Sequence, residues 1–268
     1  MNWKEYISQD TLDWLLEESN PSVRYFTLTN ILDRQETDID IIEAKKQVNE
    51  KDPVKKIFSH QNPDGSFLTD TMIKKYGKVR AKSGYLPKYK ATIWQAIFLA
   101  QLGADKNDER LKKLCKYILD NNYSEKYKTI GSYMQMKGSI LFFIMPCYIA
   151  NMVWVLSKFG FYKDQRIQNS IKWILTYQRF DDGDFNTPNE WPYRGKKDRC
   201  FGKHSCYVGC TQALKAMTVV PKDKRNEEVD KFITKGIKFI LLHKVYKKSR
   251  TKNELIRKEY ELLRFPFA

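Results

Sequence analysis

Apolar segments and amphipathic segments alternate along this chain of 268 residues. The segment 147–159 is almost wholly apolar, which predicts a helix buried on most sides, and it ends at Gly160, a residue suited to a left-handed helix cap. The segment 164–178 places Ile167, Ile171 and Ile174 on one helical face, which predicts a helix with one exposed side. The pattern therefore predicts a buried helix followed by an amphipathic one.

The same order recurs and predicts four helix pairs. We expect buried helices at 92–102, 147–159 and 206–219, amphipathic helices at 109–121, 164–178 and 227–243, and an N-terminal pair at 22–32 and 40–60. Equivalent turn positions at 61, 122, 178 and 244 define units of approximately 20–67, 90–133, 147–185 and 204–245. Units of this period bury their apolar faces on one another, so we expect an inner ring of helices inside an outer ring.

One turn carries a recognisable motif. Trp173-Ile174-x3-Gln178, followed by Gly183-x-Phe185, resembles the QW motif of the prenyltransferase and terpene cyclase (squalene oxidase) repeat superfamily. The resemblance covers roughly residues 20–245 through four degenerate copies. It implies an all-α fold, an α/α toroid of about four hairpins in a single domain (1–268). It also implies that an isoprenoid diphosphate, or another apolar ligand, binds in the barrel mouth.

The composition further narrows the classes of protein to which this chain could belong. With 42% apolar and 14% aromatic residues the chain has enough apolar side chains for a packed interior, which excludes a disordered protein. The apolar stretch 140–156 is too short to span a membrane and is broken by Pro146 and Asn151. Five cysteines, an odd number, without a secretion-signal pattern predict free thiols or metal ligands in a reducing, cytoplasmic compartment.

Cysteine and histidine gather where two buried helices are predicted to begin. Cys147 opens one of them, and Cys200, His204 and Cys206 precede the next. Because neighbouring inner helices start at the same mouth, we expect these four side chains to converge, and thiolate and imidazole suit Zn²⁺. Buried structural thiols are the alternative.

The resemblance adds to this expectation. Cys147-Tyr148 is similar to the zinc-binding Cys-Tyr of protein prenyltransferase β subunits, and His204-Ser205-Cys206-Tyr207 resembles their His-Thr-Cys-Tyr, whose histidine is a ligand. Met145 stands where the family has aspartate, so Cys200 or Cys206 would replace that ligand. Four protein ligands would make a structural site, whereas three would leave a position for substrate and support a zinc-dependent prenyl transfer.

A diphosphate would need cations near this mouth. The chain carries 48 Lys plus Arg against 32 Asp plus Glu, a net charge of +16, which attracts phosphate groups, nucleic acid or an anionic membrane surface; a solvated lysine surface is the alternative. Next to the cysteines lie basic residues that could contact phosphate: Arg194, Lys196, Lys197, Arg199 and Lys203. Aromatic residues on the buried helices could line an apolar cavity or pack in the core: Trp94, Tyr148, Trp154 and Tyr207.

Two other classes compete with an enzyme. The start at Asn20-Pro21 is typical of a HEAT-like repeat, and a basic HEAT solenoid would bind nucleic acid, but the units here recur near 60 residues rather than about 40. The second alternative is a non-catalytic toroid that acts as a binding module. The acidic run 181–184 is predicted to be a turn after a helix. A second subunit and contact with a membrane surface stay open.

Overall fold

A computed structural model describes residues 3–196 and 199–262. Its α-helices are α1 (Gln9–Leu15), α2 (Pro21–Phe26), α3 (Ile39–Glu50), α4 (Val54–Phe58), α5 (Asp70–Tyr76), α6 (Lys78–Lys82), α7 (Thr92–Gln101), α8 (Glu109–Asn122), α9 (Pro146–Leu156), α10 (Gln165–Tyr177), α11 (Tyr207–Met217) and α12 (Glu227–Leu242). Short 3-10 turns lie at Trp3–Tyr6, Lys222–Lys224 and Lys258–Glu261, and π-helical turns at Thr27–Ile31 and Ser157–Phe161.

The predicted helix pairs are confirmed for the last three units. The apolar helices α7, α9 and α11 and the amphipathic helices α8, α10 and α12 each lie within a few residues of the predicted segments. In the N-terminal unit, the helix predicted at 40–60 is divided into α3 and α4. Pro53 lies between them, and a proline cannot supply the N–H that a continuous helix needs.

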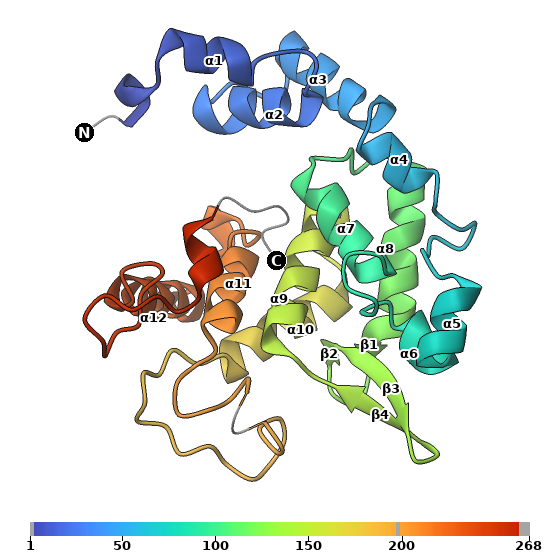
Figure 1. Ribbon diagram of the computed structural model, residues 1–268, viewed down its shortest axis with the longest axis vertical. Helices are drawn as coiled ribbons and strands as arrows, with labels where there is room; N and C mark the ends of the chain where they lie inside the picture. Colours follow the sequence, from blue (N-terminus) through green and yellow to red (C-terminus); the bar gives the residue numbers. More distant parts are fainter. Residues whose placement is uncertain (1–2, 197–198, 263–268) are drawn as a thin grey trace.

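Helix α9 lies at the centre of the core. It packs against α7, α10 and α11, and its residues 148–153 are all buried. The hairpins follow one another in an arc, from α1–α3 at the top of Figure 1, through α7–α8 and α9–α10, to α11–α12. The apolar helices α7, α9 and α11 thus form a row that is covered by the amphipathic helices.

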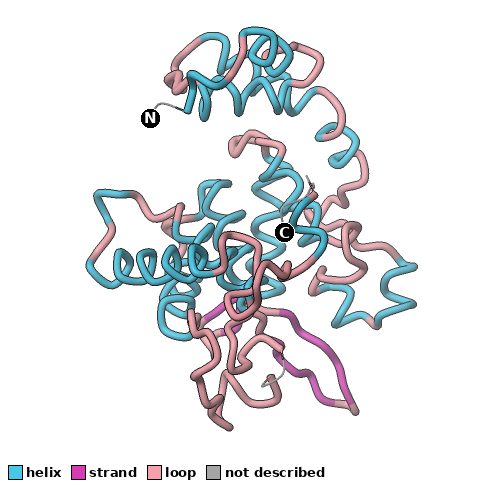
Figure 2. The backbone as a smooth tube through the Cα atoms, turned by 60° about the vertical axis from the view of Figure 1, so that its left-hand side comes forward, coloured by secondary structure: helices cyan, strands magenta, loops and turns pink. Residues whose placement is uncertain are grey.

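The prediction of an all-α toroid is wrong. The chain between α8 and α9 forms two antiparallel two-stranded sheets, β1 (Tyr123–Ser124) with β2 (Thr129–Ile130) and β3 (Ser132–Met136) with β4 (Ser139–Phe143). Ser132 pairs with Phe143 and Met136 with Ser139. Figure 2 shows both strand pairs, in magenta, at one end of the helical body. The fold is therefore mixed.

The second sheet has a local cause. Lys137 and Gly138 join its strands with φ of 47° and 79°, and two positive φ values match the right-handed twist of a tight hairpin. The β-branched and aromatic residues of β4 favour a strand. The first part of the apolar stretch 140–156 is therefore a strand, and the buried helix α9 begins only at Pro146.

Two outer helices begin with the same side-chain arrangement. Asp108 caps α8 and Asp164 caps α10, and each accepts the backbone N–H two residues on. The guanidinium of Arg110 donates two hydrogen bonds to Asp108, at 3.0 and 2.6 Å, and that of Arg166 donates two to Asp164, at 3.0 and 2.8 Å. This paired arrangement recurs after 56 residues and supports the internal repeat.

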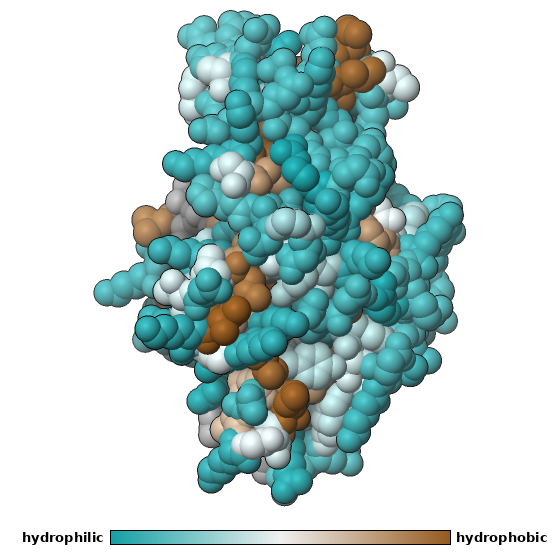
Figure 3. Space-filling view, turned by 90° about the vertical axis from the view of Figure 1, so that its right-hand side faces the viewer, coloured by the Kyte–Doolittle hydropathy of each residue, from teal (hydrophilic) through white to brown (hydrophobic). Residues whose placement is uncertain are grey.

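The face of the molecule shown in Figure 3 is mainly hydrophilic, and hydrophobic side chains form only small, separate patches on it. Among the described residues, no helix combines the length and the apolar character required to cross a bilayer.

Replacing Asp164 by Ala should destabilise the fold by about 1–2 kcal/mol at pH 7, because the α10 cap and the partner of Arg166 are lost together. Its hydrogen bonds to Arg166 lower the pKa of Asp164, so this stability is present above the unfolded pKa and is lost as the pH falls through the folded one. Urea unfolding at pH 7 and at about pH 2.5 measures both effects.

Glu43→Ala on the exposed face of α3 is the matched control and should change stability by less than about 0.5 kcal/mol. An Asp164→Ala variant as stable as this control at pH 7, or one with an undiminished deficit at low pH, would contradict the role assigned to the cap.

Candidate functional site

Three of the predicted cysteines lie near one another. Cys147 is in the first turn of α9, Cys206 is the N-cap residue of α11, and Cys200 lies in the preceding loop. Burial raises the pKa of Cys147 to about 12, and the charges of Cys206 and Cys200 add to this effect. Burial and the charge of Cys206 also raise the pKa of Cys200. Cys206 therefore lies close enough to Cys147 and Cys200 for its charge to oppose the ionisation of both.

His204 takes a different partner. Its Nδ1 lies 3.2 Å from Oδ1 of Asp182, in the segment after α10. Within residues 3–196 and 199–262, no group of three or more His, Cys, Asp and Glu side chains has the arrangement needed to hold a metal ion. The convergence of all four predicted ligands on one ion stays a prediction.

Backbone pairing holds His204 beside Asp182. The two residues form an antiparallel bridge, with N–H of Gly183 donating to the Lys203 carbonyl at 3.1 Å and N–H of Ser205 donating to the Asp181 carbonyl at 2.8 Å. The acidic run 181–184 follows α10, as expected, but it is an extended segment with Asp182 in the bridge and a bend at Gly183. It also supplies a carboxylate to the entrance of α11.

Two further segments contact the same carboxylate. Nε2 of His243, which follows α12, lies 3.6 Å from Oδ1 of Asp182. Beyond it in sequence, Ser249 Oγ donates to Asp182 Oδ2 at 2.5 Å, and the Arg250 guanidinium donates to the Asp182 carbonyl. One aspartate thus joins the segment after α10, the start of α11 and the segment after α12.

The hydrogen bonds determine where the imidazoles carry their protons. A carboxylate only accepts, so Nδ1 of His204 carries a proton and Nε2 is the acceptor of the neutral ring. Nδ1 of His243 lies 2.8 Å from the Phe239 carbonyl, so it too is protonated. Nε2 of His243 can then form an ion pair with Asp182 only when the ring is charged.

The charge of Asp182 is compensated. Burial alone would raise the pKa of this carboxyl, but hydrogen bonds from Ser249 and His204 and the charges of His243 and Arg250 hold it below its usual value. Gly183 has a φ of 115°, which favours glycine, and a Cβ at this position would lie against the Arg250 guanidinium. A side chain at residue 183 would therefore displace Arg250 from its present position beside the Asp182 backbone.

These side chains line a cavity of about 350 Å³. Lys248, Ser205, Tyr207 and Thr251 also contribute to its wall. Thr251 Oγ1 is buried and has no hydrogen-bond partner among the described residues, so the wall offers an unused polar group. We call this cavity the Asp182 pocket.

The predicted phosphate-binding residues do not form one group. Lys196 donates to the Ile144 carbonyl at 2.7 Å and lies over the Phe143 and Phe201 rings, and burial lowers its pKa. The side chains of Arg194, Arg199 and Lys203 are exposed. Lys197 lies outside the described residues.

The predicted aromatic residues divide into two kinds. Trp94 and Tyr148 are buried, where Trp94 donates to the Tyr85 carbonyl and the Tyr148 hydroxyl accepts from Asn122. Tyr207 lines the Asp182 pocket, and Trp154 lines another cavity at the opposite ends of the buried helices.

Sequence reasoning missed most of the Asp182 pocket. Asp182 was assigned to a turn, and His243, Ser249 and Arg250 lie at or beyond the end of the last repeat. The only sequence signal for this pocket was the small number of histidines: the chain has three. The structure places two of them beside the carboxylate of Asp182. In comparisons with known proteins, no family model, no curated protein and no solved structure matches this chain.

Proposed function

We propose that the chain is an enzyme that acts on a small phosphate-bearing substrate in the Asp182 pocket. One observation carries the proposal: Asp182 Oδ1 lies 3.2 Å from His204 Nδ1 beside His243, Ser249 and Arg250, in a cavity of about 350 Å³. A carboxylate that orients an imidazole is a general way of preparing a proton acceptor.

In this proposal, His204 transfers a proton and the cationic side chains of the pocket bind the phosphate. Asp182 is a positioning residue that keeps the proton of neutral His204 on Nδ1. Nε2 of His204 can then accept a proton from an attacking hydroxyl or water, or return one to a leaving group. Arg250 and Lys248 supply positive charge for the phosphate oxygens. Lys248 also pairs with Glu254 at 2.8 Å, so Arg250 is the stronger candidate.

The QW resemblance suggests the substrate class. An isoprenoid diphosphate combines an anionic head with an apolar chain, and Tyr207 offers an aromatic wall in the same pocket. A prenyl transfer or a diphosphate hydrolysis would both release an anionic leaving group that His204 and Arg250 could stabilise. We therefore use farnesyl diphosphate as the test substrate.

His204→Asn should lower kcat for diphosphate release from farnesyl diphosphate by about 10²- to 10⁴-fold, because asparagine can still donate to Asp182 but cannot transfer a proton. KM should change little, because the cationic side chains are retained. Released diphosphate is measured with and without added Zn²⁺.

His60→Asn is the matched control: His60 is exposed, and its Nδ1 also contacts a backbone carbonyl, that of Lys56 at 2.8 Å. It should keep wild-type rates. A wild-type chain that neither binds nor cleaves farnesyl diphosphate, or equal rates for the two variants, would overturn the proposal.

A second candidate function is zinc binding by Cys147, Cys200 and Cys206, favoured by the positions of Cys147 in the first turn of α9 and of Cys206 at the start of the neighbouring α11. The three side chains would have to move closer together to share one ion. Zinc prefers thiolate ligands and would displace their protons. If His204 stays on Asp182, three thiols leave one position for substrate, and bound Zn²⁺ would there supply a Lewis acid.

Metal analysis after dialysis against Zn²⁺ should find about one ion per chain. Cys147→Ser should lose it, whereas Cys115→Ala should keep it, because Cys115 is buried in α8. His204→Ala separates the two ligand sets: retained zinc supports three thiols, and lost zinc supports the four-ligand site. A wild-type chain without zinc would exclude both.

A further inference from the structure

A second cavity lies at the opposite ends of the buried helices. It has a volume of about 820 Å³ and is lined by residues at or just beyond the C-terminal ends of α7, α9 and α11, and by residues of α2 and α3 that face them. On α11, Tyr207 at the first position lines the Asp182 pocket, whereas Lys215 and Thr218 at the other end line this one. The two cavities are separate sites.

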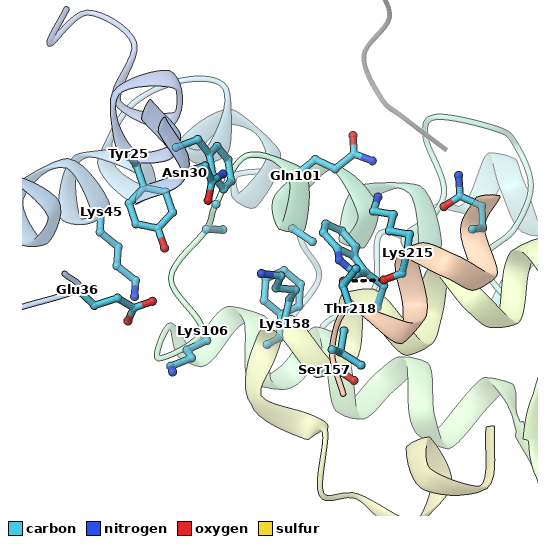
Figure 4. A pocket seen from close by; sticks show the side chains of 18 of the residues that line it. Tyr25, Asn30, Glu36, Lys45, Gln101, Lys106, Ser157, Lys158, Lys215 and Thr218 are labelled. Carbon is cyan, nitrogen blue, oxygen red and sulfur yellow. Dashed lines mark hydrogen bonds between the residues drawn. The ribbon is translucent and has the colours of Figure 1, made fainter. Parts of the chain in front are cut away.

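Four lysines surround this cavity. Lys45, Lys106, Lys158 and Lys215 belong to its lining, and Figure 4 shows them on several different elements around the opening. Glu36 is the one carboxylate of the lining, and the structure gives these four lysines no ion pair of 4.0 Å or less within the described ranges. The cavity therefore has an excess of positive charge.

Lys215 is the lysine on which the excess of positive charge has the clearest effect. Its Nζ lies 3.7 Å from the centroid of the Trp154 ring, so the ammonium is packed against an aromatic wall. Burial, together with the charge of Lys158, lowers the pKa of Lys215 to about 8. A solvated lysine at a helix end would keep its usual pKa near 10.4.

The remaining wall suits a ligand with two parts. Ser157, the residue that follows α9 and precedes Lys158, belongs to the lining, and its Oγ is buried without a hydrogen-bond partner among the described residues. Tyr25, Phe26 and Phe159 add aromatic surface. Cations and an unused hydroxyl beside aromatic rings fit a phosphate attached to an aromatic or apolar group.

We propose that this lysine cavity is a binding site for a phosphorylated small molecule, whose phosphate lies between Lys158 and Lys215 and whose apolar part contacts Trp154. The site is independent of the Asp182 pocket. Binding should return Lys215 to its charged form, because an anion beside it offsets burial and the repulsion from Lys158. Lys45 and Lys106 are the other lysines of the lining, and Glu36 is its one carboxylate.

The test is isothermal titration calorimetry of the full chain with phenyl phosphate, in pairs of buffers with different ionisation enthalpies. Phenyl phosphate is almost entirely a dianion above pH 7, so proton uptake reports on the protein. We expect uptake of about 0.7 proton per ligand at pH 8.5 and close to zero at pH 7, as a lysine with a pKa of about 8 requires.

Three variants test separately whether binding needs the positive charge of the lysines and whether it needs Lys215 to take up a proton. Lys215→Met should weaken binding by about tenfold or more and abolish proton uptake, while its side chain still covers Trp154. Lys215→Arg should bind without uptake, because guanidinium stays charged. Lys158→Met, an exposed position, should also weaken binding by about tenfold and provides a second test if Lys215→Met does not fold.

Lys46→Met is the control, since Lys46 is exposed on α3 outside the lining; it should bind like the wild type. His204→Asn should also bind normally, which separates this site from the proposed active site. A wild-type affinity equal to that of Lys158→Met, or binding without proton uptake at pH 8.5, would overturn the proposal.

Discussion

The candidate site depends on one carboxylate. Asp182 accepts hydrogen bonds from His204 and Ser249, faces His243 and, through its carbonyl, accepts from Arg250. These partners lie 22 to 68 residues further along the chain. The Asp182 side chain is partly buried, and a carboxylate that is withdrawn from water is destabilised unless such partners compensate its charge. The same contacts that satisfy Asp182 orient the imidazoles.

The helical frame brings these partners together. Helices α9 and α11 pack side by side, and α10 and α12 cover them, so the segment after α10 meets both the entrance of α11 and the end of α12. At the opposite ends of the buried helices, the same parallel arrangement gathers lysines instead of histidines. The row of buried helices thus has a cavity at each end, the Asp182 pocket with its histidines and the lysine cavity.

The helices were predictable and the site largely was not. Apolar positions at helical spacing located α7 to α12, because burial of one face is a local property of sequence. The β3–β4 hairpin was not predicted, because the stretch 140–156 was considered only for its apolar composition. Lys137-Gly138 before it is a turn signal that could have indicated the hairpin. The expected convergence of Cys147, Cys200, His204 and Cys206 rested on the starts of two neighbouring helices, and it did not anticipate that His204 contacts Asp182. The other partners of Asp182 did not follow from the repeat, because Ser249 and Arg250 lie outside it.

The most direct test of the account is to determine which nitrogen carries the proton in each of the three imidazoles. Long-range ¹H–¹⁵N spectra, recorded at a pH where the rings are neutral, give this assignment. The structure predicts that His204 and His243 carry the proton on Nδ1. In Asp182→Ala, His204 should revert to the Nε2–H form that free histidine prefers, while His60, bonded to the Lys56 carbonyl, stays unchanged. A wild-type His204 with its proton on Nε2, or a His204 signal that Asp182→Ala leaves unaltered, would contradict the central role of Asp182.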